Sequence, residues 1–377
     1  MAPIWSLQPF KTLYTAFIAA KVLTSLPWLL VRYGLRSARP FPEWSLKYTI
    51  LNSVLRDLFT WYAKTRHDGF SSVISDHQKE TQRHALAQPA DPGLYCGILA
   101  PSTAVIPAPV SGLWYPSRLL ATSPDIEHAK VVLHVPGGAF VLALGQDIWG
   151  RLISRPLLES PVASHVLFAQ YRVAFNTSTR FPAAIQDMLT CYHYVLSLGV
   201  HPKNIILSGD SAGGNLTLSL LRYLETLNSD TSSPTTLPLP GGAMLWSPWV
   251  HVTPQAGSDF ASSRNSTSDS IVPEILEWGV EAYFPQAEPT AEELAYISPL
   301  HHPFYTKVPL FIHAGGVEGF FEPIREFAGQ MAGVDGNRVR FHSTDLVVHD
   351  LLMGYDGAGL DKEIQTAVED AARFFES

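Results

Sequence analysis

The chain has 377 residues, of which 46% are hydrophobic and 16% charged, and this balance excludes an intrinsically disordered protein. Its formal net charge of −8 argues against a nucleic acid as the main partner. The two cysteines, Cys96 and Cys191, stand far apart and in no metal-ligand spacing, so the sequence predicts neither a disulfide framework nor a cysteine metal site. A chain of this length can form one large α/β domain, alone or with a substantial cap.

The N-terminal segment, residues 1–42, differs in charge from the rest because it holds five basic residues and no acid. Within it, residues 13–35 form an apolar stretch that is long enough to span a bilayer, although Lys21 and Pro27 interrupt it. Three interpretations stay open. The stretch forms a helix that covers the mouth of a pocket, a helix that lies on a membrane surface, or a membrane span.

The next segment shows apolar residues at helical spacing over 44–64, which predicts an amphipathic helix. No strand pattern precedes about residue 93. We therefore expect an N-terminal helical region over residues 1–92, followed by an α/β domain over residues 93–377.

In the second region short apolar runs alternate with helical patterns. Strands are predicted over 130–135, 164–171, 204–209, 242–247, 309–314 and 338–344. Helices are predicted over 181–199, 212–227, 322–333 and 361–375. This alternation indicates a mostly parallel sheet with helices on both faces. It stops over about 250–305, which we interpret as an insertion containing a helix at 274–284.

The most informative motif is GDSAGG, residues 209–214, which follows a predicted strand and precedes a predicted helix. It matches the nucleophile elbow G-x-S-x-G, in which a serine projects from a sharp strand-to-helix turn. Gly209 and Gly213 support this turn because side chains there would meet the packed strand and helix, and Asp210 stands between glycine and serine. Ser211 is therefore the candidate nucleophile, and an ordinary glycine-rich turn is the alternative.

A serine nucleophile needs a base, and the base needs an acid that orients it. His349 follows the last predicted strand and precedes the closing helix, so it is the candidate base. Glu318 is the first carboxylate after the preceding strand and is the candidate acid. The weaker candidates for the acid are Glu322, Asp345 and Asp350.

Acyl transfer also needs donors for the negative oxygen of the intermediate. The segment PGGAF, residues 136–140, follows a strand, and Gly137 lets its backbone turn inward. The candidate donors of this oxyanion hole are the amides of Gly138, Ala139 and Ala212.

Taken together, these motifs resemble the hormone-sensitive-lipase group of α/β hydrolases over about residues 95–376. PGGAF looks like the group's His-Gly-Gly-Gly-Phe, residues 171–187 look like its Tyr-Arg segment running into Phe-Pro-Ala-Ala, and GDSAGGNLTL matches its nucleophile motif. Pro136 and Ala139 depart from the group's pattern. The resemblance implies an α/β-hydrolase fold with a mostly parallel eight-stranded sheet, helices on both faces, and a helical cap built from the N-terminal helices and the insertion.

The resemblance also implies a serine carboxylic-ester hydrolase that needs no metal or organic cofactor. Residues 13–34 are similar to leaders of fungal steryl-acetate hydrolases and of secondary-metabolite hydrolases, which implies a hydrophobic small-molecule ester, such as an acetylated or lactone natural product. It also implies an intracellular location, in the cytoplasm or at a membrane such as the endoplasmic reticulum. Two alternatives stay open: an acyltransferase or cyclase that uses the same serine, and a non-catalytic small-molecule-binding protein.

Overall fold

The computed structural model describes residues 3–66, 82–124, 126–229, 236–354 and 357–377. Its centre is an eight-stranded sheet in the order β1-β2-β4-β3-β5-β6-β7-β8. The strands are β1 (His84–Ala87), β2 (Val110–Tyr115), β3 (Val131–Val135), β4 (His165–Gln170), β5 (Ile205–Asp210), β6 (Gly242–Trp246), β7 (Leu310–Gly315) and β8 (Val339–Thr344). Strand β2 pairs antiparallel with both neighbours and the other pairs are parallel, which confirms the predicted mostly parallel sheet.

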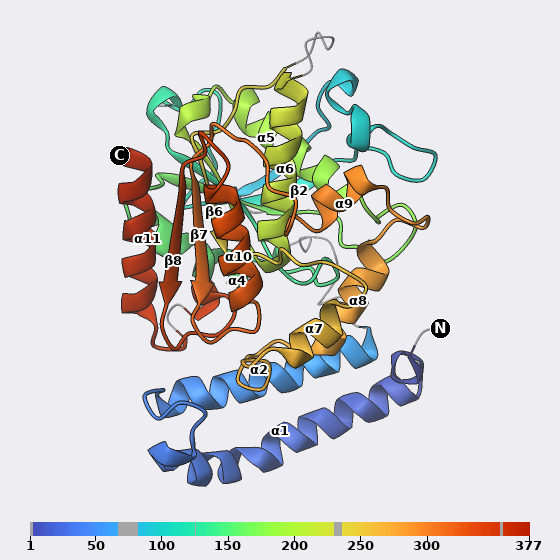
Figure 1. Ribbon diagram of the computed structural model, residues 1–377, viewed down its shortest axis with the longest axis vertical. Helices are drawn as coiled ribbons and strands as arrows, with labels where there is room; N and C mark the ends of the chain where they lie inside the picture. The colour runs from blue at the N-terminus through green and yellow to red at the C-terminus, as the bar shows by residue number, and fades with distance from the viewer. Residues whose placement is uncertain (1–2, 67–81, 125, 230–235, 355–356) are drawn as a thin grey trace.

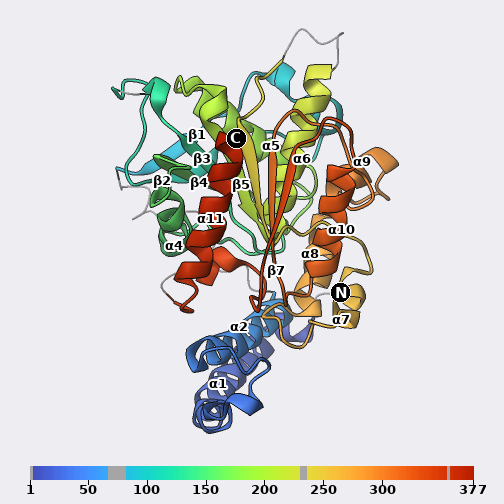
Figure 2. The ribbon, with the colours of Figure 1, turned by 60° about the vertical axis from the view of Figure 1, so that its left-hand side comes forward.

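Helices cover both faces of this sheet, as Figure 2 shows with the sheet nearly edge-on. One face is covered by α4 (Asp147–Leu158) and α11 (Asp361–Glu376). The other is covered by α5 (Ala183–Ser197), α6 (Ser211–Ser229) and α10 (Phe321–Ala332). Every residue of β3, β5, β6 and β7 is buried, which explains why these strands are continuous apolar runs in the sequence.

The insertion forms three helices, α7 (Ala256–Ser262), α8 (Pro273–Tyr283) and α9 (Ala291–Ile297). Two further helices, α1 (Phe10–Gly34) and α2 (Leu46–Thr65), lie side by side at one end of the molecule (Figure 1). Helix α2 packs against α8, so the N-terminal helices and the insertion together form the cap that the resemblance implies.

Two expectations from the sequence are wrong. A strand does precede residue 93, because β1 lies at the sheet edge over His84–Ala87. It has only four residues and two alanines, too short to show a strand pattern. Helix α1 continues through Pro27, which we expected to interrupt the apolar stretch. Strand β2 and helix α4 also escaped the pattern analysis; α4 contains Gly150 and Pro156, which weaken a helical signal.

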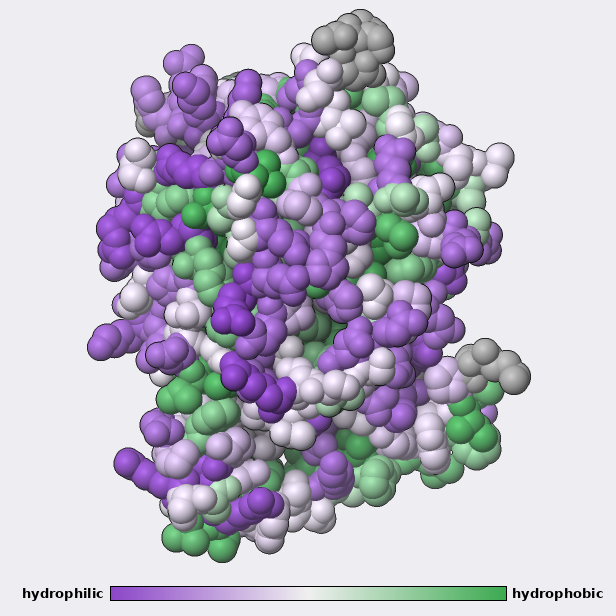
Figure 3. All heavy atoms as spheres, viewed as in Figure 1, coloured by the Kyte–Doolittle hydropathy of each residue, from purple (hydrophilic) through white to green (hydrophobic). Residues whose placement is uncertain are grey.

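By length and composition, helix α1 could cross a membrane, and only 11% of its most apolar 18-residue stretch is buried. It contacts α2 along its length, whereas α2 contributes side chains to the cavity described below. The interpretation of residues 13–35 as the helix that covers a pocket therefore applies to α2 instead. Figure 3 shows apolar side chains at the surface of the end where α1 lies.

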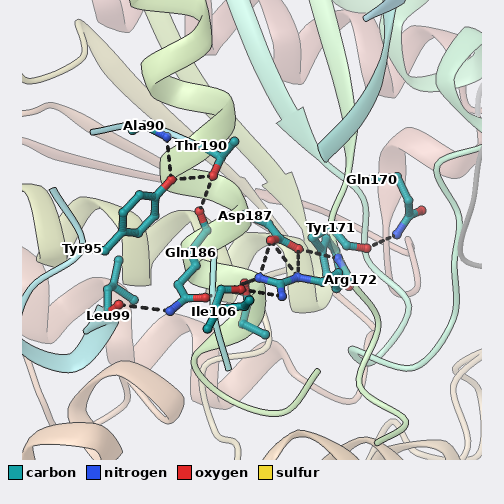
Figure 4. Close-up of polar contacts among 11 residues, drawn as sticks. Ala90, Tyr95, Leu99, Ile106, Gln170, Tyr171, Arg172, Gln186, Asp187 and Thr190 are labelled. Carbon is teal, nitrogen blue, oxygen red and sulfur yellow. Dashed lines mark hydrogen bonds and ion pairs between the residues drawn. The ribbon is translucent and has the colours of Figure 1, made fainter. Parts of the chain in front are cut away.

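The Tyr-Arg segment noted in the sequence forms an ion pair between a partly exposed arginine and a buried aspartate, shown in Figure 4. Arg172, just after β4, lies 2.7 Å from a carboxylate oxygen of Asp187 in α5, and Asp187 is fully buried. The backbone N–H of Arg172 donates to the same carboxylate, and its guanidinium also donates to the carbonyl of Ile106. This segment therefore ties α5 to the loop after β4, and its role is structural.

Candidate active site

Ser211 lies at the junction between β5 and α6, as the G-x-S-x-G pattern predicts. Its φ angle is +51°, in the left-handed region that costs a residue with a Cβ about 1 kcal/mol or more. Such strain persists only where the surrounding structure imposes it, and it is a recurrent feature of functional sites. The turn is therefore a strained elbow that presents the serine at the carboxyl end of the sheet, where open parallel sheets bind ligands.

The glycines around this elbow are required by close approach of the backbone. A Cβ on Gly209 would collide with the carbonyl of Gly213, and a Cβ on Gly213 would collide with the carbonyl of Val135. A Cβ on Gly137 would collide with the side chains of Asp210 and Ser211. The predicted supporting residues thus let β3, β5 and α6 come close enough for the elbow to form.

His349 and Glu318 lie together on neighbouring loops at the same edge of the sheet. Glu318 follows β7 and His349 follows β8, and Nδ1 of the histidine lies 3.1 Å from Oε2 of the glutamate. The Glu318 side chain is fully buried and that of His349 is 7% exposed. Two of the other predicted acids have different surroundings: Glu322 pairs with arginines at the surface, and Asp345 is exposed. The third, Asp350, is described below.

The electrostatics of this pair follow from its burial. Burial raises the pKa of Glu318 above its usual value, against the opposing effect of His349. Burial alone would lower the pKa of His349, but the hydrogen bond and the negative charge of Glu318 outweigh it and raise this pKa. The carboxylate therefore favours the imidazolium form, which is the form a base adopts after it accepts a proton.

A cavity of about 70 Å³ lies over the elbow, and both Ser211 and His349 line it. In the described part of the chain no hydrogen bond joins the two side chains, and such contacts often tighten only when substrate binds. The remaining walls are mostly apolar and come from α2, from the loop after β3 and from the insertion. They include Leu55, Phe59, Leu142, Ile271 and Leu276.

The loop after β3 brings the candidate oxyanion donors to the same cavity. Gly138 and Ala139 line the cavity, and their φ angles are +113° and +50°. Ala139, which stands where the resembled group has a glycine, thus adopts the left-handed conformation that only glycine takes freely. Neither amide donates a hydrogen bond to any described residue. Ala212 is fully buried directly after Ser211, in the first turn of α6, where N–H groups have no intrahelical acceptor.

A buried polar network behind the elbow was missed by the sequence analysis. Asp210 accepts from the backbone N–H of Gly137 at 2.8 Å and lies 3.0 Å from Nε2 of His134. Nδ1 of His134 lies 3.0 Å from Oγ of Ser208. This network fixes the oxyanion loop against the strand that carries the nucleophile. The available signal was a histidine within an apolar strand, because a buried polar side chain needs partners.

Asp350 follows the candidate base and also lines the cavity. Burial, together with the nearby charge of Asp210, raises its pKa well above the usual value, which favours the protonated form of this carboxyl. A neutral carboxyl can donate a hydrogen bond, which a carboxylate cannot. Asp350 is therefore a further polar group of the cavity, in addition to Ser211 and His349.

Comparison with known proteins agrees with this architecture. A family model described as the alpha/beta hydrolase fold matches residues 132–353, which include the elbow, Glu318 and His349. The chain belongs to the α/β-hydrolase family. Because every predicted site residue from Gly137 to His349 lies within the matched segment, the family model covers the whole candidate site.

Relatives and solved structures point to the same group. An acetyl-hydrolase of Streptomyces hygroscopicus is 28% identical over 226 residues, covering 60% of this chain and 69% of the relative. An esterase of Acinetobacter venetianus is 28% identical over 180 residues, covering 45% and 54%. A crystal structure of an esterase from the bacterial hormone-sensitive-lipase family superposes with a TM-score of 0.59 at 20% identity, over 86% of this chain and 98% of that one. These matches confirm the resemblance to the hormone-sensitive-lipase group.

Proposed function

We propose that this α/β hydrolase cleaves carboxylic esters with Ser211 as nucleophile, His349 as base and Glu318 as the acid that orients it. The observation that carries the proposal is geometric. A strained serine elbow, a histidine hydrogen-bonded to a buried glutamate, and two unpaired amides meet at one cavity. The names of the relatives, an acetyl-hydrolase and an esterase, support the same class of enzyme.

In the proposed reaction the Ser211 hydroxyl attacks the acyl carbon, and Nε2 of His349 accepts its proton. Glu318 stabilises the resulting imidazolium at Nδ1. The amides of Gly138, Ala139 and Ala212 donate to the oxyanion of the tetrahedral intermediate. His349 then gives the proton to the departing alcohol, and a water activated by the same histidine hydrolyses the acyl-enzyme. That no metal or organic cofactor takes part stays a prediction.

We propose that the substrate is the ester of a small acyl group, such as acetyl, with a hydrophobic alcohol. The cavity over Ser211 is small, at about 70 Å³, and its walls are mostly apolar. A pocket of this kind favours a short acyl chain on the serine side and an apolar group against the cap. The acetyl-hydrolase relative agrees with the acyl part of this proposal.

The test is the hydrolysis of p-nitrophenyl acetate, butyrate, octanoate and palmitate by the wild type and by Ser211→Ala. We expect the acetate or butyrate to be cleaved fastest and the variant to be inactive. In H₂¹⁸O the released acid should carry one ¹⁸O atom. Turnover that survives in Ser211→Ala would contradict the proposal, and an ester or ring product without ¹⁸O would indicate acyl transfer or cyclisation instead.

We also propose that α1 lies on a membrane surface rather than across the bilayer. Its apolar side chains are exposed, among them Leu13, Phe17, Leu23, Leu30 and Val31. Helix α1 remains fastened to α2, since Lys21 pairs with Asp57 at 2.6 Å and Trp61 donates to Thr15. A membrane span would have to break these contacts, whereas a surface helix keeps them and buries only its outer face.

The basic residues of this region, including Arg32 and Arg36, would attract anionic headgroups. Flotation with vesicles tests this idea. We expect binding to vesicles that contain phosphatidylserine, weaker binding to pure phosphatidylcholine, and release by carbonate at high pH. Resistance to carbonate would indicate a span, and no flotation with either vesicle would contradict membrane binding.

A further inference from the structure

The segment between α7 and α8 carries a buried carboxylate that contacts both catalytic loops. Asp269 is fully buried, and its side chain accepts hydrogen bonds from three backbone N–H groups. Oδ2 accepts from Gly319 at 2.6 Å, and Oδ1 accepts from His349 at 3.2 Å and from Ser270 at 2.7 Å. Gly319 directly follows Glu318, so one carboxylate holds the backbone of both the acid loop and the base loop.

The charge of this group is unusual for its position. In the described part of the chain no lysine, arginine or histidine forms an ion pair with Asp269. A buried charge without a counter-ion is costly, and here its compensation comes from three charge-assisted bonds to backbone N–H groups. Two of those three bonds end on the loops that carry the proposed acid and base. The bonds that compensate the buried charge therefore also fix the positions of these two loops.

The Asp269 segment is itself held from the N-terminal region. Nη1 of Arg56 on α2 donates to three backbone carbonyls of the segment: those of Ser266 and Asp269, each at 2.7 Å, and that of Ile271 at 3.2 Å. The amide of Asn52, one helical turn earlier, donates to the carbonyl of Ser268 at 2.7 Å. Figure 1 shows α2 crossing beneath α7 and α8, the helices that bound this segment. Helix α2 lies outside the segment that matches the family model.

We infer that Asp269 is a positioning residue that sets the distance between Glu318 and His349. Arg56 in turn holds the Asp269 segment in the position from which the carboxylate reaches both loops. The inference rests on the proposed function, because it assigns a role within the site formed by Ser211, His349 and Glu318. A second bond supports the same arrangement, since the side-chain amide of Asn265 donates to the carbonyl of Glu318 at 3.1 Å.

Asp269→Asn is the sharpest variant because it keeps the size of the side chain. Asparagine has one acceptor oxygen, and its NH₂ group would face a backbone N–H that now donates to a carboxylate. One loop would then lose its contact. We expect kcat on p-nitrophenyl acetate to fall by about 10- to 100-fold with KM nearly unchanged, since a displacement of about 1 Å can cost a factor of 10².

The pH profile separates positioning from a general loss of folding, because the position of its acidic limb does not depend on the fraction of enzyme that is folded. The charged groups that raise the pKa of His349 are Glu318, Asp269 and Asp210. The neighbouring carboxyl of Asp350 has a raised pKa itself, because it is buried and lies near Asp210. Removing the Asp269 charge removes one group that favours the imidazolium. The acidic limb of kcat/KM should therefore move to lower pH in Asp269→Asn.

Two matched controls use the same structural elements. Asp259→Asn removes a half-exposed carboxylate of α7 that pairs with His251, and Lys64→Gln removes a surface ion pair between α2 and Glu274. Both should keep the wild-type kcat and the wild-type acidic limb. Arg56→Ala should lower kcat in the same way as Asp269→Asn, and Arg56→Lys, which keeps a cationic donor, should recover part of the loss.

The outcomes separate this inference from the proposed function. A wild type that neither turns over the ester nor reacts with a fluorophosphonate would overturn both. An active wild type beside Asp269→Asn with an unchanged kcat and acidic limb would overturn the inference alone. If Asp269→Asn does not fold, the Arg56 pair decides: a low kcat in Arg56→Ala that Arg56→Lys restores supports the inference, and equal wild-type activity in both overturns it.

Discussion

The sheet and the N-terminal helix α2 build walls of the same cavity, but they contribute different kinds of side chain. Loops at the ends of the strands supply the polar groups, among them Ser211, His349 and the amide of Gly138. Helix α2 supplies apolar groups, Leu55 and Phe59, from a segment far away in the sequence. The difference indicates that the sheet sets the chemistry while the helices set the shape of the pocket and hold the loops above it.

The largest expected effect is a loss of activity when a catalytic residue at the end of the sheet is removed. His349→Ala should lower kcat/KM for p-nitrophenyl acetate by about 10⁴-fold or more, equal to about 5 kcal/mol of transition-state stabilisation. The reason is that, among the described residues that line the cavity, His349 is the base that is hydrogen-bonded to a buried acid. Steady-state kinetics with active-site titration measures the effect. A loss of less than tenfold would show that the strand-end histidine is not the base.

The next effect concerns the stability of the sheet domain. Arg172→Ala leaves the carboxylate of Asp187 buried without its partner, which should lower the free energy of unfolding by about 3–5 kcal/mol. Chemical denaturation followed by tryptophan fluorescence measures it. Arg373→Ala is the control, because its ion pairs on α11 are exposed and should change stability by about 0.5 kcal/mol or less. Equal stability of the two variants would argue against the structural role given to this segment.

A smaller effect is expected from the apolar wall. Phe59→Ala on α2 should enlarge the cavity and raise kcat/KM for longer acyl chains relative to acetate, by about 3- to 10-fold. Leu58→Ala, its exposed neighbour, should keep the wild-type chain-length profile. The ratio of octanoate to acetate turnover is the measurement. An identical ratio in all three proteins would show that α2 does not determine which acyl chains the enzyme accepts.

The smallest effect belongs to α1. The double change Phe17→Ser and Leu30→Ser alters only exposed side chains, so hydrolysis of a soluble ester should stay within about twofold of the wild type. The same variant should lose vesicle binding because the apolar outer face is weakened. A variant that floats like the wild type would place the lipid contact elsewhere on the molecule.

The central part of the fold could be predicted from the sequence because its strands are buried on both faces. Strands such as β3 and β5 are continuous apolar runs, and the glycines around Ser211 carry a steric requirement that local sequence displays. The edge strand β1 could not be predicted, since a strand of only four residues, two of them alanines, carries too little pattern. The candidate triad followed from chain order, because Ser211, Glu318 and His349 follow the parallel strands β5, β7 and β8.

The supporting contacts could not be predicted, for a different reason. Arg56 meets the carbonyl of Asp269 across 213 positions, and a side chain that binds backbone carbonyls places no demand on residue types there. Asp269 itself looks like an ordinary loop aspartate. His134 offered a weak signal as a histidine in an apolar strand, but its partner Asp210 became visible only in the fold.

The most direct test of the central claim is labelling with a fluorophosphonate followed by peptide mass spectrometry. The account predicts one labelled site, Ser211, with a rate that rises with pH as His349 loses its proton and that falls sharply in His349→Ala. A label on another serine, no label in the wild type, or an equal rate in the two proteins would contradict a Ser211 nucleophile activated by His349.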